Sequence, residues 1–181
     1  MNLSRRMYRF VIIVHVAASV AWLGLSLALL VLGLTVMSAG EAGVQFASAT
    51  AMSILASTIA VPIGATALVS GLVLALGTRW SLRYRWVLVK LIATCATFTL
   101  TLVLLRPSLA ALAAEVDPAR LIAVDQGVIM GPIVSSTVYI TAIALSYVKP
   151  WGAAGKPRRR PVERRAARPE ARRPEPARSS R

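Results

Sequence analysis

Four long apolar stretches constrain most strongly what this chain can fold into. A helix needs roughly 17 to 25 mostly apolar residues to cross the hydrocarbon core of a bilayer. A soluble helix of that length would need a polar face, but the first stretch contains a single ionisable side chain, His15. The sequence therefore predicts an all-α bundle of four transmembrane helices within residues 10–148. The predicted spans are about 10–36, 49–76, 86–105 and 124–147.

The Lys and Arg residues between these stretches indicate an orientation, because short cationic connections stay on the cytoplasmic side of a membrane. Residues 1–9, the second connection and the C-terminal segment are basic, whereas the first connection carries only Glu41. Four crossings place the N-terminus, the second connection and the C-terminus on the same side of the membrane, so all three basic segments share that side. We therefore predict a multi-pass protein of a bacterial plasma membrane, with N and C termini in the cytoplasm.

The C-terminal segment, residues 149–181, differs in composition from the rest of the chain. It holds 12 Lys or Arg against 3 Glu, within a chain whose net charge is +14, and it is rich in Pro and Ala. Such a segment has too little apolar surface to fold alone, so we predict a disordered tail. Its cations would attract anionic lipid headgroups, by on the order of 1 kcal/mol each near the surface. Nucleic-acid binding is not predicted, because no aromatic residue follows Trp151 to stack on bases.

Small side chains at helical spacing mark the faces through which membrane helices pack. In the second stretch these residues form a regular seam, and Pro62 beside it predicts a kink in the same helix. In the fourth stretch, Gly127 and Gly131 form a GxxxG pair. The seam consists of Thr50, Ser53, Ser57, Ala60, Gly64, Ala67 and Gly71.

Polar residues inside the spans are the candidates for a functional site, because they are costly in lipid. His15, Ser19 and Trp22 share a face of the first helix, and Lys90 and Thr94 share a face of the third. The simplest role for His15 is a hydrogen-bonded interior residue at the depth of Lys90, and Lys90 suits an anchor whose ammonium reaches the interface. The alternatives for His15 are haem or metal ligation and proton handling. A bis-histidine haem would require a dimer, or a Met as partner, because the chain has one His.

Motifs of known chemistry are absent from the sequence. It contains no HExxH zinc motif, no Walker A loop and no Cys-x-x-Cys, since Cys95 is its single cysteine. We therefore predict a non-enzymatic bundle without a cofactor that acts by association, with itself or with a membrane complex. The alternative is a small haem-, metal- or proton-handling membrane protein that uses His15.

Four segments of the chain carry a resemblance to a known group of proteins. They are Val14–Gly24, Ser70–Trp80, Arg85–Leu91 and Tyr147–Gly152. In combination they resemble small four-helix integral membrane proteins of actinobacteria, an uncharacterised family with a domain of unknown function. The resemblance covers residues 10–152 and excludes most of the tail. It implies the same four-helix fold in a bacterial plasma membrane, and no catalytic residue.

Overall fold

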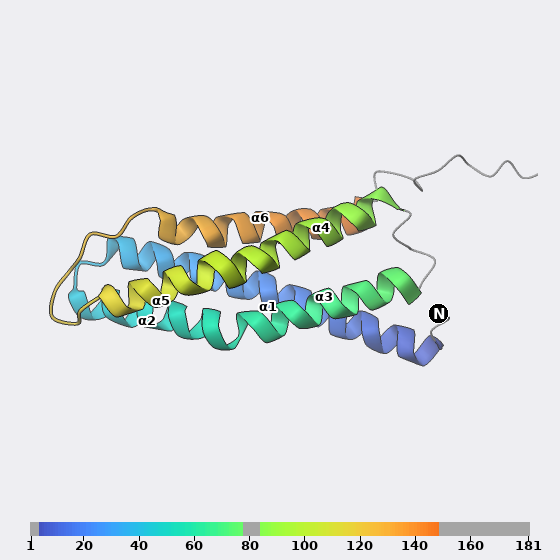
Figure 1. Cartoon of the computed structure of the whole chain (residues 1–181), viewed down its shortest axis with the longest axis horizontal. Helices are drawn as coiled ribbons and strands as arrows, with labels where there is room; N and C mark the ends of the chain where they lie inside the picture. The colour runs from blue at the N-terminus through green and yellow to red at the C-terminus, as the bar shows by residue number, and fades with distance from the viewer. Residues whose placement is uncertain (1–3, 78–83, 149–181) are drawn as a thin grey trace, which may run out of the picture.

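The computed structural model describes residues 4–77 and 84–148, and most of these residues are helical. They form four long apolar rods of 34, 36, 31 and 22 residues, each able to cross a membrane (Figure 1). The predicted all-α four-helix bundle is confirmed. The first three predicted spans each lie within one rod, and the fourth, 124–147, begins three residues before its helix. The predicted tail lies outside the described residues. The elements are α1 (Arg5–Ser38), α2 (Ala42–Thr58), α3 (Ala60–Gly77), α4 (Arg85–Leu100), the π-helical η1 (Thr101–Leu105), α5 (Arg106–Glu115) and α6 (Gly127–Val148). The first rod is α1, the second consists of α2 and α3, the third of α4, η1 and α5, and the fourth is α6.

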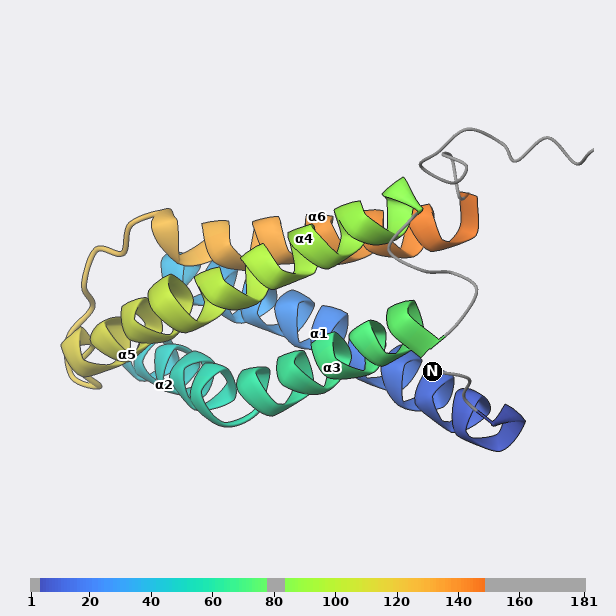
Figure 2. The same ribbon diagram turned by 45° about the vertical axis from the view of Figure 1, so that its right-hand side comes forward.

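The second rod bends where α2 meets α3, as Figures 1 and 2 show. The helices are separated by Ile59, three residues before Pro62. Proline has no backbone N–H, so the Thr58 carbonyl loses the partner that a continuous α-helix would provide. The neighbouring bonds persist, because the Ile63 N–H still donates to the Ile59 carbonyl at 3.2 Å. The kink predicted from Pro62 is therefore present.

The third rod continues ten residues beyond its predicted end, because its backbone accommodates Pro107. That proline cannot donate to the Val103 carbonyl four residues earlier. In η1 the backbone hydrogen bonds span five residues instead of four, so the Arg106 N–H donates to the Thr101 carbonyl. A π-helical turn inserts one extra residue and lets the helix resume. The helix therefore does not end with the predicted span near residue 105, because α5 extends the rod to Glu115.

Helix α1 occupies the centre of the bundle and packs against α2, α3 and α6. Helix α4 lies against α3 and α6, whereas α5 lies against α2 (Figure 2). The third rod thus crosses from one neighbour to another along its length. The buried core follows α1 from Ala18 to Val36 and includes Met52 and Leu109. Large apolar side chains such as Ile13, Val69 and Val103 remain exposed around the outside, and a bilayer would cover them.

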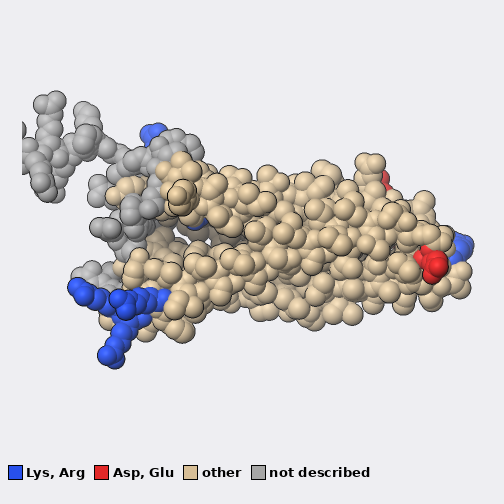
Figure 3. Space-filling model, turned by 180° about the vertical axis from the view of Figure 1, so that it is seen from behind, with Lys and Arg blue, Asp and Glu red and all other residues tan. Residues whose placement is uncertain are grey.

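The described acidic side chains gather at one end of the bundle, where Arg120 also lies, and the opposite end carries basic side chains (Figure 3). Helices α1 and α4 begin at one end, where Arg5 and Arg85 lie. At the other end, Glu41 caps α2 and Glu115 closes α5. We refer to these as the basic end and the acidic end. The acidic end also contains the connection from Val116 to Gln126 that leads into α6.

Candidate functional site

Trp22 is the point at which all four rods meet. It is 3% exposed and stands edge-on to Phe98 of α4, with ring centroids 5.8 Å apart. On another side it stacks at a tilt on Tyr139 of α6, at 4.7 Å between centroids. A Cβ placed on Gly64 of α3 would lie 2.8 Å from the indole and 2.7 Å from the Phe98 ring. The missing side chain at Gly64 therefore lets the two rings approach the α3 backbone.

His15 joins α1 to α3 through one ring nitrogen. Its Nδ1 lies 3.0 Å from the carbonyl oxygen of Ala67 and 3.1 Å from the Ser70 hydroxyl. A carbonyl only accepts, so this contact assigns the proton to Nδ1 and leaves Nε2 as the acceptor. The ring also lies on Gly71, where an added Cβ would be 3.0 Å from Cε1. His15 is thus an interior, hydrogen-bonded residue.

A small cavity of about 80 Å³ brings three of the candidate residues together, because His15, Lys90 and Thr94 all line it. The Lys90 amino group donates to the Ser146 hydroxyl of α6 and lies 5.9 Å from the centre of the Trp86 ring. Lys90 therefore connects α4 to α6, at a serine two residues before the end of α6. Ser19 is half-buried and does not line this cavity.

The described residues around the cavity do not form a metal site. Residues 4–77 and 84–148 contain no group of three or more His, Cys, Asp or Glu side chains that could hold one. His15 already uses Nδ1 on α3, so only Nε2 could bind a ligand. The arrangement fits a structural role for His15, as a hydrogen-bonded link between α1 and α3.

The predicted packing seam is present in α3 and absent from α2. Ala60, Gly64 and Ala67 are buried, but Ser57 is exposed and its hydroxyl donates to its own helix at Ile54. In α2 the residues one position before each seam residue face the core instead. The buried residues of α2 are Gln45, Ser48, Ala49, Met52 and Ala56.

The two glycines of the GxxxG pair have different surroundings. A Cβ on Gly131 would lie 2.7 Å from Leu105 of η1, so Gly131 is a contact between rods. Gly127 is exposed at the start of α6, and a Cβ there would meet only the carboxylate of Asp125, two residues earlier. Its backbone N–H donates to that carboxylate at 2.7 Å. Gly127 therefore belongs to the start of the helix and makes no contact between rods.

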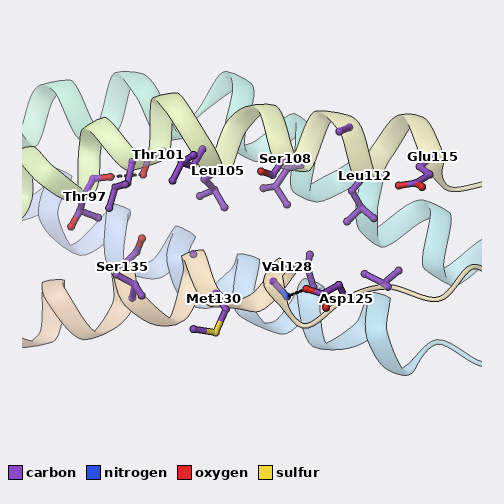
Figure 4. Close-up of a pocket in the computed structure, with 18 of the residues that line it drawn as sticks. Thr97, Thr101, Leu105, Ser108, Leu112, Glu115, Asp125, Val128, Met130 and Ser135 are labelled. Carbon is purple, nitrogen blue, oxygen red and sulfur yellow. Dashed lines mark hydrogen bonds between the residues drawn. The ribbon is translucent and has the colours of Figure 1, made fainter.

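A groove of about 750 Å³ runs between the third rod and α6, toward the acidic end (Figure 4). It exists because α5 packs on α2, which leaves the wall of α6 uncovered. Its lining is mostly apolar, with the hydroxyls of Thr97, Thr101 and Ser135 toward mid-bundle and the carboxylates of Glu115 and Asp125 at the outer end. Sequence reasoning missed this groove, because it ended the third span before α5.

Gln45 is a buried polar residue that sequence reasoning also missed. It is 3% exposed, and its side-chain amide donates to the carbonyls of Val36 at 3.1 Å and Ile122 at 3.0 Å. Its side-chain oxygen accepts from the Ile122 N–H at 3.0 Å. Two of these bonds hold the connection before α6 against α2, and the third joins α2 to α1. A lone amide in an apolar stretch was the available signal, because a buried amide needs partners.

We expect His15→Asn to leave folding nearly intact, since Asn can still donate and accept, whereas His15→Leu should cost on the order of 1 kcal/mol from one lost interhelical bond. Thermal unfolding of the purified variants in detergent measures both effects, and a visible absorption spectrum of the wild type accompanies it. A Soret band or copurified metal that disappears in the Asn variant would contradict the structural role and make His15 a ligand.

No family model, curated protein or solved structure matches this chain. The four-helix membrane architecture that the actinobacterial resemblance implies is present in the structure, without an identified family.

Proposed function

We propose that this protein is a non-enzymatic helical bundle that acts by association in the membrane, with a second copy of itself as its partner. The observation that carries the proposal is the poor burial of the third rod. In its most apolar stretch, 11% of the residues are buried, against 33%, 28% and 22% in the other three rods. The third rod therefore has the largest share of its surface available to another helix.

The exposed side of α4 and η1 has the character of a helix contact surface. A stripe of residues at spacings of 4, 3, 4 and 4 lies on one side of the rod, and Ile92 and Val103 within it are 60% and 64% exposed. In lipid, helices associate by close packing, which apolar and small side chains on one face allow. We call this the third-rod stripe, composed of Leu88, Ile92, Cys95, Thr99 and Val103.

Cys95 offers a direct test, because it is exposed within the stripe and is the single cysteine of the chain. We expect copper-phenanthroline oxidation in membranes to convert the wild type to a disulfide-linked dimer, measured by non-reducing gel electrophoresis. The matched control is Cys95→Ser combined with Val69→Cys, since Val69 is 62% exposed on α3 at a similar distance from the basic end. Equal dimer yields from both proteins would reject the stripe as the contact surface.

The proposal places the basic end in the cytoplasm, because the described ends differ in charge as the positive-inside rule requires. It follows that the C-terminal tail would lie against anionic headgroups of the same leaflet. Reporter fusions after residues 40, 80, 115 and 160 should read outside, inside, outside and inside. An outside signal after residue 80 would contradict this orientation.

The alternative function, haem, metal or proton handling through His15, receives less support from the geometry. One His15 nitrogen is committed to α3, and the cavity beside it has a volume of about 80 Å³. A haem would not enter a cavity of that size without separating the helices. An origin in the plasma membrane of an actinobacterium is proposed from the resemblance alone.

A further inference from the structure

We infer that the groove between the third rod and α6 binds an amphiphile with one apolar chain and a cationic head, taken from the leaflet at the acidic end. This inference goes beyond the proposed association, since none of the stripe residues lines the groove. It rests on three properties of the groove: its size, its opening and its charge.

The groove has the size and shape of a ligand site. Its volume of about 750 Å³ lies within the range of roughly 300–1,000 Å³ that is typical of small-molecule sites. Its wall on the third rod extends from Thr97 to Glu115, which corresponds to about 27 Å at the helical rise. A long, narrow and mostly apolar trough fits an extended chain better than a compact molecule.

The groove opens sideways, toward the space that lipid would occupy. Leu104, Met130 and Val134 line it and are also exposed on the outer surface, at 56%, 54% and 44%. A chain in the bilayer could therefore enter between the rods without first leaving the hydrocarbon region. At the inner end, the hydroxyls of Thr97 and Thr101 already donate to their own helix, so only their oxygen lone pairs face a ligand.

The charge at the outer end of the groove favours a cationic head group on the amphiphile. Glu115 and Asp125 stand at the outer end of the groove, one on each wall (Figure 4). Within residues 4–77 and 84–148, neither carboxylate forms an ion pair, and the Asp125 carboxylate accepts one hydrogen bond, from the backbone N–H of Gly127. Two carboxylates would repel an anionic head and attract an ammonium. An amphiphile aligned with its head at the interface would place that ammonium between them.

The test uses the full chain in phosphatidylcholine nanodiscs and two amphiphiles of equal chain length, a quaternary ammonium and a carboxylate, each with a nitroxide near the chain end. Electron paramagnetic resonance measures the motionally restricted fraction during titration. We expect the cationic probe to bind on the order of tenfold more tightly than the anionic probe. Glu115→Gln with Asp125→Asn should remove that preference, and the Asn can still accept the bond from Gly127.

Two variants fill the groove from opposite walls, Ser108→Trp and Met130→Trp, both at exposed positions that line it. Each should abolish the restricted fraction, whereas Val103→Trp, on the stripe, should leave it unchanged. Equal binding of the two probes in the wild type, or a restricted fraction that survives both blocking variants, would overturn the inference. If a partner helix fills the groove instead, the wild type should show no restricted probe, and Ser108→Trp should reduce Cys95 cross-linking.

Discussion

Gly64→Leu should destabilise the bundle more than any other single substitution on α3. The added Cβ alone would lie 2.7 Å from the Phe98 ring and 2.8 Å from the Trp22 ring. Neither ring can withdraw easily, because Trp22 stands edge-on to Phe98 and packs on Tyr139 on another side. Overpacking of a filled core costs about 1–3 kcal/mol or more, and we expect about 3 kcal/mol here. Thermal unfolding in detergent, followed by circular dichroism, measures the loss.

The matched control is Val69→Leu on the same helix, at a position that is 62% exposed. This change should be silent, because the larger side chain extends into lipid or detergent. Val73 would serve less well, since it is half-buried. Phe98→Ala combined with Gly64→Leu should recover part of the lost stability by vacating the space that Leu needs. Equal losses of stability for Gly64→Leu and Val69→Leu would contradict the close contact of the four rods at Trp22.

Gln45→Ala should detach the connection before α6 from the rest of the acidic end. The substitution leaves the Ile122 N–H and the carbonyls of Val36 and Ile122 without their side-chain partner. An unsatisfied buried group costs about 1–3 kcal/mol, so the sum should reach about 3 kcal/mol unless water enters. We expect a lower unfolding temperature and faster amide exchange at Ile122, measured by hydrogen–deuterium exchange with mass spectrometry.

Gln126→Ala is the matched control, because Gln126 is an exposed glutamine in the same connection. It should change neither the unfolding temperature nor the exchange rate at Ile122. Gln45→Glu adds a separate comparison: its carboxylate can still accept from the Ile122 N–H, but it offers no donor to the two carbonyls when ionised. If Gln45→Ala and Gln126→Ala gave the same exchange rates at Ile122, Gln45 would not hold this connection in place.

The sequence by itself determined the number of apolar spans and the all-α fold class. Water is absent from the hydrocarbon core, so a long apolar segment must satisfy its backbone within a helix. The same local reasoning located the kink near Pro62 and the close approach at Gly64, because a missing N–H and a missing Cβ act within one helix. His15 as an interior residue at the depth of Lys90 also followed from spacing along the helices.

Only the tertiary structure decided the partners of these residues. His15 meets Ser70, and Gln45 meets Ile122, across 55 and 77 positions of sequence, a distance that no helical period encodes. The groove depends on the same kind of contact. A π-helical turn carries the third rod past Pro107, and α5 then packs on α2 and leaves α6 uncovered. Local spacing indicates which face of a helix is polar or small, but the neighbour that covers that face depends on how all the rods pack together.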